Sequence, residues 1–194
     1  MESALPLWLK LGCMIYVSVL VPVYLRRYGA ANFLWFSDIA LFGTVAALWL
    51  ESSLIASTMA VAIVLLELVW TVDFLARLVS GVKLMGLSHY MFDTKISIPI
   101  RALSLFHLIL PPLLVWMVWR LEYDERAFAV QTVLAWIVLS LSRVISTPKE
   151  NINWVYGLGS TRQHYGLLYF IALMIGFPLI VYLPTHLILK ALFN

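Results

Sequence analysis

Mostly apolar stretches, separated by short polar connections, follow one another along the whole chain. A stretch of about 20 apolar residues is long enough to cross the hydrocarbon core of a bilayer as a helix. We therefore predict six membrane-spanning helices: Leu5–Leu25, Asn32–Leu50, Leu54–Leu75, Leu103–Trp119, Phe128–Leu141 with short extensions, and Tyr165–Leu189. No internal repeat interrupts this pattern. Residues 1–194 are accordingly predicted to form a single all-α domain, a six-helix transmembrane bundle.

Two of the connections are long. Arg77–Arg101 joins the third and fourth predicted spans, and Arg143–His164 joins the last two. The first contains a mixed segment, Met85–Ile100, in which Tyr90 and other apolar residues alternate with charged ones. It is too polar to cross a membrane. We expect a connecting loop there; the alternatives are an amphipathic segment at the cytoplasmic interface and a segment that covers a cavity.

Composition supports an integral membrane protein. Hydrophobic residues make up 63% of the 194 residues and charged residues only 12%, whereas a soluble domain has about 25% charged residues. This excludes an ordinary cytosolic domain and a disordered chain. The only cysteine, Cys13, excludes a disulfide scaffold. The first apolar stretch has no basic region before it and no small-residue cleavage site after it, so we interpret it as a retained span.

The distribution of basic residues predicts an orientation. Nine of the 13 lysines and arginines fall in the first, third and fifth connections, and four fall on the other side. Basic residues are enriched in cytoplasmic loops. We therefore expect those three connections in the cytoplasm, both termini outside, and a multi-pass protein of the bacterial inner membrane. No basic stripe with interleaved aromatic residues is present, so nucleic acid is not an expected partner.

Three predicted spans each place one ionisable residue well inside the half of the membrane that faces the basic connections, and Asp73 lies close to the same end of the third span. Asp38 and His107 lie roughly 8–9 Å below that surface, and Glu67 roughly 13 Å, at 1.5 Å of rise per residue. Such residues usually face the interior of a bundle. We predict a shared polar pocket that opens toward the cytoplasm. Asp38 and His107 should lie within roughly 3–6 Å, with Glu67 forming a deeper wall.

Each acidic residue also has an ordinary structural partner within reach. These pairs are Asp38 with Arg26 or Arg27, Glu67 with Thr71, and Asp73 with Arg77. We expect the third to be an ion pair, because its members are four residues apart on one helix. The other two alternatives stay open.

The sequence around His107 predicts an irregular helix. Pro111 and Pro112 cannot donate to the carbonyl groups of His107 and Leu108, so a kink is expected where the histidine projects. Ser104, three residues before His107, lies on nearly the same face. A Ser–His pair is either a nucleophile with its base or a hydrogen bond that stabilises the helix.

Other chemistries have no motif. The chain contains no H-E-x-x-H, G-x-S-x-G, P-loop or G-x-G-x-x-G pattern. Its four histidines show no metal-ligand spacing. We therefore predict neither a metal nor a cofactor.

Three stretches resemble a family of six-span membrane proteins, the androgen-induced-protein-like intramembrane hydrolases with the bacterial YwaF-type proteins and their animal acyltransferase relatives. Phe33–Ile39 resembles the family's second-span motif, a catalytic threonine followed three residues later by an aspartate, here Asp38. His107–Pro112 is similar to its histidine with a proline five residues on. Asn151–Tyr156 resembles the polar-aromatic stretch before the last span. The resemblance implies a lipid-active hydrolase or acyltransferase.

This chain departs from the family at the nucleophile. Trp35 occupies the threonine position, and Ser37, two residues later, is turned about 200° around the helix from Trp35, so it cannot simply replace the threonine. The predicted catalytic residues are His107 as general base and Asp38 as the residue that orients it. Residues predicted to bind a lipid-like, amphipathic small molecule are Glu67, Trp35, Ser37, Trp70, Ser104 and Asn153. A non-catalytic carrier and a structural membrane protein are the open alternatives.

Overall fold

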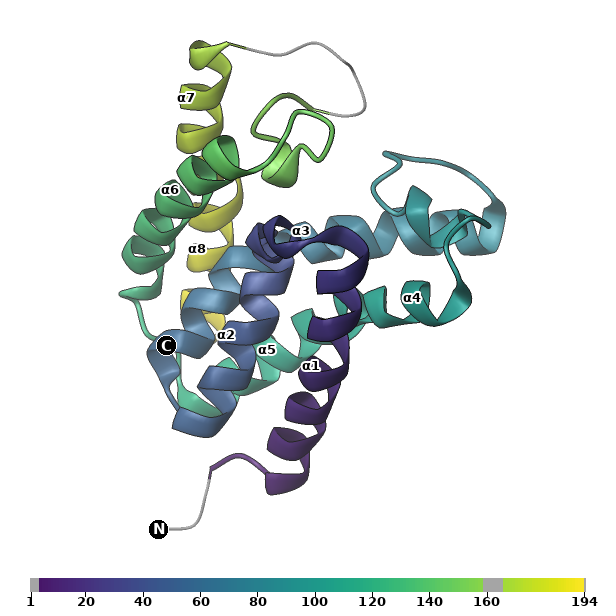
Figure 1. Cartoon of the computed structure of the whole chain (residues 1–194). Helices are drawn as coiled ribbons and strands as arrows, with labels where there is room; N and C mark the ends of the chain where they lie inside the picture. Colours follow the sequence, from purple (N-terminus) through teal and green to yellow (C-terminus); the bar gives the residue numbers. More distant parts are fainter. Residues whose placement is uncertain (1–3, 159–165, 194) are drawn as a thin grey trace.

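The computed structural model describes residues 4–158 and 166–193, and within these ranges every regular element is a helix. The described residues form eight α-helices, labelled in Figure 1: α1 (Leu7–Tyr28), α2 (Phe36–Leu50), α3 (Ser53–Ser80), α4 (Ile98–Ala102), α5 (Phe106–Leu121), α6 (Ala127–Ile145), α7 (Leu167–Gly176) and α8 (Leu183–Phe193). Four short 3₁₀ turns are η1 (Ala30–Leu34), η2 (His89–Phe92), η3 (Leu103–Leu105) and η4 (Ile152–Trp154). A π-helical segment, η5 (Phe177–Tyr182), joins α7 to α8.

Among the described residues, five helical segments are long and apolar enough to cross a membrane. They are Leu7–Tyr28, Ser53–Ser80, Ile98–Leu121, Ala127–Ile145 and Leu167–Phe193. The predicted second span is shorter: α2 has 15 residues, about 22 Å of helix against a hydrocarbon core of about 30 Å. The all-helical class and the membrane-type helices are confirmed, whereas the sixth crossing is not. The predicted start of the last span, Tyr165, lies outside the described residues.

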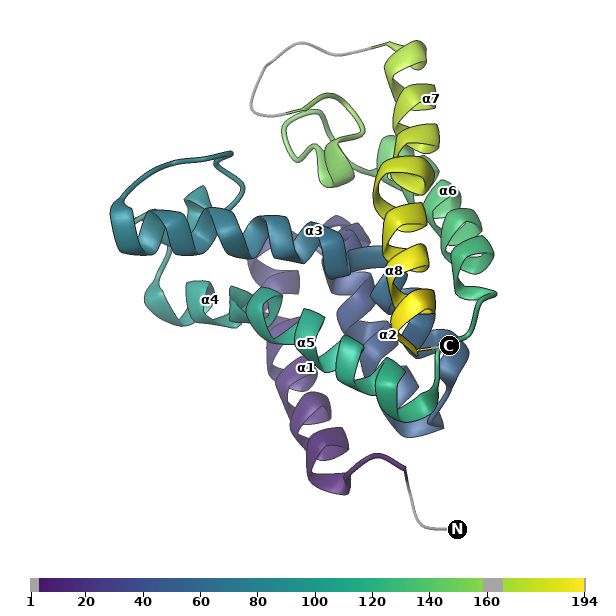
Figure 2. The same cartoon turned by 180° about the vertical axis from the view of Figure 1, so that it is seen from behind.

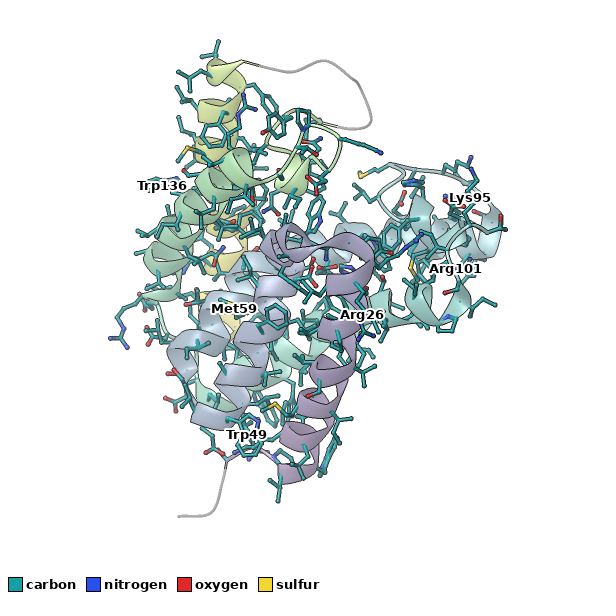
Figure 3. All side chains as sticks on the ribbon, viewed as in Figure 1. Arg26, Trp49, Met59, Lys95, Arg101 and Trp136 are labelled. Atoms are coloured by element: carbon teal, nitrogen blue, oxygen red, sulfur yellow. The ribbon has the colours of Figure 1, made fainter. Side chains whose placement is uncertain are left out.

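Small residues bring α2 and α3 close together. Ala40, Ala47, Ala56 and Ala60 are completely buried. A Cβ atom added at Gly43 would lie 2.3 Å from the sulfur of Met59, the α3 residue that Figure 3 labels beside α2. Small residues let helix backbones approach, which is the usual basis of helix association in membranes.

A tight turn sets the antiparallel course of these two helices. Glu51, the C-cap of α2, has a left-handed backbone conformation (φ 49°), and Ser52 caps the start of α3 because its hydroxyl accepts the N–H of Ile55. The Glu51 carboxylate binds the Lys10 ammonium at 2.7 Å and the N–H of Ala4 at 3.0 Å. This end of the molecule is therefore fixed by a buried lysine of α1 and the acidic residue of the turn.

Helix α3 is the central element, because it packs against α2, α5, α6 and α8. In Figures 1 and 2 its C-terminal half runs crosswise to α1 and α2 and projects to one side of the molecule. The segment that follows α3, and then α4, lie near its far end. Helices α6, α7 and α8 lie on the opposite side. The oblique course of α3 means that position along this helix does not measure depth along α2.

The segment after α3 folds back over that helix. Asp73 accepts four hydrogen bonds from it: the N–H groups of Met85, Gly86 and Ser88, at 2.8–3.0 Å, and the Ser88 hydroxyl at 2.7 Å. The predicted ion pair between Asp73 and Arg77 is therefore wrong, since the backbone of the returning segment supplies the donors. Met91 packs on Trp70 and Phe74 in the same place, so this mixed segment covers the side of α3.

Candidate functional site

The structure brings Glu67 and His107 into direct contact. The Nδ1 of His107 lies 2.8 Å from Oε2 of Glu67, which joins the first turn of α5 to the middle of α3. Only 14% of the histidine side chain and 6% of the glutamate side chain are exposed. A carboxylate at Nδ1 makes that nitrogen the N–H donor and directs the basic lone pair to Nε2.

Aromatic rings fix the plane of the imidazole. His107 stacks on Trp70 with ring centroids 4.7 Å apart, and on its neighbour Phe106 at 4.2 Å. Trp70 stacks in turn on Phe74 at 5.2 Å. The Nε2 atom has no hydrogen bond to a group in the described parts of the chain. A positioned imidazole with a free nitrogen is what proton transfer to a bound molecule requires.

Hydroxyl groups line the surroundings of this pair. Ser104 hydrogen-bonds Tyr24 of α1 at 2.8 Å, and Tyr90 of η2 interacts with the same serine and with Glu67. Burial raises the pKa of the Tyr90 phenol, so it stays a neutral hydroxyl. Tyr16 donates a hydrogen bond to the carbonyl of Leu103. Three tyrosines from two segments therefore surround η3 and the start of α5.

Asp38 is buried near these groups and is poorly satisfied. Only 3% of the residue is exposed. Its Oδ2 accepts a hydrogen bond from the Asn32 amide at 3.1 Å, whereas its buried Oδ1 has no partner in residues 4–158 or 166–193. Glu67 and Tyr16 interact with it electrostatically. Asp38 thus borders the cluster from α2.

The structure changes the role expected for each carboxylate. The group bonded to His107 is Glu67, which was predicted to be the deeper wall, and the hydrogen-bond partner of Asp38 is Asn32. The depth estimate assumed that the helices run parallel. Since the C-terminal half of α3 runs crosswise to α2 (Figures 1 and 2), distance along α3 does not give depth, and Glu67 meets His107.

The irregular backbone next to His107 lies before the histidine. Helix α5 continues through Pro111 and Pro112 to Leu121. The change of helix type occurs at η3, between α4 and α5. Ser104 belongs to this 3₁₀ turn, where the helical pitch changes, and its hydroxyl is hydrogen-bonded to Tyr24. The predicted Ser104–His107 pair is therefore replaced by a Ser104–Tyr24 pair.

Two further predicted site residues lie at the start of α2. Trp35 packs edge-on against Trp154, with ring centroids 5.9 Å apart. Asn153, 1% exposed, accepts the N–H of Phe36 and donates to the Leu34 carbonyl and the Ser142 hydroxyl. Its amide therefore caps α2 from a distant loop. This gives Asn153 a positioning role for the helix that carries Asp38.

Of the remaining predicted residues, one lies beside His107 and one at the start of α2. Trp70 forms an apolar flank of His107, whereas Ser37 is half-buried in the first turn of α2. Sequence reasoning missed Tyr24, Asn32 and the contact of Tyr90. Two signals were available in the sequence: Tyr24 near the C-terminal end of the first predicted span, and the mixed segment around Tyr90. No rule of sequence spacing relates residues that lie so far apart in the chain.

Two hollows on the surface lie away from the His107–Glu67 pair. One, of about 210 Å³, is lined by Leu68, Val69, Val72, Asp73, Leu84 and Met85. The other, of about 460 Å³, is lined by Trp136, Ile137, Ser140, Leu141 and Val144 of α6. Both are almost entirely apolar. Neither hollow is lined by Asp38, Glu67 or His107, so the polar pocket shared by these residues stays a prediction.

The arrangement can accept and return a proton at His107 Nε2, with Glu67 stabilising the imidazolium. Within the described residues, no serine, threonine or cysteine is hydrogen-bonded to that nitrogen. No family model matches the chain, and no curated protein or solved structure is significantly similar to it.

Proposed function

We propose that this chain is a multi-pass membrane protein that binds a lipid-like, amphipathic molecule at the Glu67–His107 pair and hydrolyses an acyl ester there. The observation that carries the proposal is the 2.8 Å contact between Nδ1 and a carboxylate, with Nε2 free. This is the orientation of imidazole in a general base that a carboxylate positions. The likeness to the intramembrane hydrolase family, at His107–Pro112 and around Asp38, points to the same substrate class.

Water is the nucleophile in this proposal, because Trp35 stands at the position of the family's threonine. His107 Nε2 takes a proton from water while the oxygen attacks the acyl carbonyl carbon. The tetrahedral intermediate then breaks its bond to the alcohol oxygen, and the imidazolium returns the proton to that leaving group. Glu67 stabilises the positive charge on the ring between the two transfers.

Hydrolysis of acyl esters by the purified chain in detergent tests this function. His107→Gln should lower the rate by about 10²–10⁴-fold, the usual contribution of a general base. Glu67→Gln should also lower it, because an amide can present an N–H to Nδ1 and select the wrong tautomer. The matched control is His186→Gln, which removes a histidine bonded to Tyr123 at 2.7 Å near the other end of α5 and should leave the rate unchanged.

A non-catalytic carrier is a second candidate, favoured by one specific observation: Ser104 is committed to Tyr24, and His107 has no hydroxyl or thiol partner in the described chain. A carrier needs the same head-group site but no nucleophile. Saturable binding of a fluorescent fatty-acid derivative that His107→Gln weakens, without hydrolysis by the unmodified chain, would favour this candidate. If the unmodified chain and His107→Gln neither bind the fatty-acid derivative differently nor hydrolyse esters at different rates, the cluster has a structural role.

The proposed topology has six crossings, with η1, Trp35 and α2 forming the second. The basic connections then face the cytoplasm and both termini lie outside. In a Cys13→Ser background, Lys149→Cys should be labelled by a membrane-impermeant thiol reagent only after the cytoplasmic face is opened. Glu122→Cys should be labelled in intact cells. The reverse pattern would invert the orientation, and accessibility of both positions from one side would remove a crossing between them.

A further inference from the structure

Two arginines from different helices meet at the turn η2. The guanidinium of Arg77, in the last turn of α3, lies 4.4 Å from the centroid of the Phe92 ring. Arg101 of α4 donates a hydrogen bond from Nη1 to the carbonyl of Met91 at 2.8 Å. The two cations are therefore anchored on consecutive residues of one short turn.

Both guanidinium groups keep unused donors. Arg77 Nη1 and Arg101 Nε are buried and have no hydrogen-bond partner in the described parts of the chain. Neither arginine forms an ion pair there. An unpaired buried N–H is costly, and a guanidinium has five donors arranged for planar anions such as phosphate.

Within the described residues, neither nearby carboxylate forms an ion pair with these arginines. Asp73 accepts its four hydrogen bonds from residues 85–88. Asp93, next to Phe92, accepts the backbone N–H of Lys95. The positive charge of the arginine pair is therefore left for a group from outside the chain.

An apolar hollow on α3 reaches Asp73, one helical turn before Arg77, and further basic residues lie on the same projecting part of the molecule. Asp73 and Met85 belong to the 210 Å³ hollow, which continues along Leu68 and Val72 of α3. Figure 3 shows Arg101 and Lys95 on the same projecting part of the molecule. A phosphate at the arginines would thus have an apolar surface beside it, at the end of a membrane-type helix where lipid head groups are expected.

We propose that Arg77 and Arg101 bind a phosphate group, that of an anionic membrane lipid whose acyl chain lies in the hollow along Leu68 and Val72. Basic pockets between transmembrane helices recognise anionic head groups in this way. The site is separate from the Glu67–His107 pair, and the proposal does not depend on ester hydrolysis.

Native mass spectrometry of the chain, released from mixed micelles of phosphatidylglycerol and phosphatidylcholine, tests the site. The unmodified chain should retain one phosphatidylglycerol in preference to phosphatidylcholine. Arg77→Gln/Arg101→Gln should weaken that retention roughly tenfold to thirtyfold, since each basic group near an anionic lipid surface strengthens binding about fivefold. The control Arg26→Gln/Arg27→Gln removes the same charge from two exposed residues at the end of α1 and should change it less than about twofold.

Equal loss in both double variants would mean non-specific attraction and overturn the site. Displacement of the lipid by millimolar inorganic phosphate, with phosphate retained by the chain, would overturn its assignment to a lipid. Arg77→Lys/Arg101→Lys serves as the folding check, because it keeps the charge but not the planar fork. Weaker retention with unchanged unfolding temperature supports the proposal, and unchanged retention contradicts the guanidinium geometry.

Discussion

Asp38 and Asp73 are the same residue type, on neighbouring apolar helices, at almost the same burial: 3% and 2% exposed. Their surroundings differ completely. Asp73 accepts four hydrogen bonds from a returning segment, whereas Asp38 accepts one from Asn32 and leaves Oδ1 without a partner in the described residues. A buried carboxylate with all its acceptor sites used has a structural function. One with an unused oxygen is available for a bound group.

The difference also shows why the charge of a residue in a span is not enough to identify a site. Burying a charged group is costly unless hydrogen bonds replace its water. Three backbone N–H groups and the Ser88 hydroxyl do so for Asp73, so the residue stabilises the segment that carries Tyr90. The cost at Asp38 is not offset in this way, which is the usual condition of groups kept for function.

The largest effect is expected for Asp73→Ala. The variant leaves three N–H groups without their acceptor, and each buried donor without a partner costs about 1–3 kcal/mol. We expect the free energy of unfolding in detergent to fall by about 3 kcal/mol or more, with faster proteolysis near Met85. Stability equal to that of the unmodified chain would contradict the structural role of this carboxylate.

A smaller effect is expected for Asn153→Ala, which removes the distant cap of α2. The N–H of Phe36 and the carbonyl of Leu34 both lose their partner. Loss of a helix cap costs about 0.5–2 kcal/mol, and we expect the upper end of this range because the site is buried. Chemical unfolding measures it. The more conservative Asn153→Asp keeps the acceptor for Phe36 and should restore part of the loss.

Ser88→Ala sharpens the comparison by removing one of the four donors to Asp73. Its hydroxyl bond is lost while its backbone N–H remains. A hydrogen bond to a charged group contributes about 1.5–3 kcal/mol, and we expect the lower value because three donors persist. If thermal unfolding shows a loss as large as that of Asp73→Ala, the serine hydroxyl would outweigh the backbone donors.

The smallest change in stability is expected for Asp38→Asn. The substitution removes a buried charge that has a single donor, so the free energy of unfolding should change by less than about 1 kcal/mol or increase. Substrate binding or hydrolysis should decrease if Asp38 borders the site as proposed. A loss of stability comparable to that of Asp73→Ala, measured under identical conditions, would show that both aspartates are structural.

The positions of the apolar segments could be predicted from sequence, because a membrane-type helix is defined by local composition and length. The predicted third span, Leu54–Leu75, lies within α3, and the predicted fifth span lies within α6. The ends were less accurate. Helix α3 continues to Ser80 because Asp73 and the segment folded over it stabilise its last turns, a contribution that local hydropathy does not include.

The sequence by itself determined the all-helical class, the apolar helices and the candidate residues Asp38, Glu67, Trp70 and His107, since each follows from residue type and position within a stretch. The tertiary structure decided the partners. It determined three sets of hydrogen bonds: Glu67 with His107, Asn32 with Asp38, and the backbone of residues 85–88 with Asp73. The physical reason is that rise along a helix fixes a position on its own axis only. The packing of α3 against α5, with its C-terminal half crosswise to α2, decides which side chains meet.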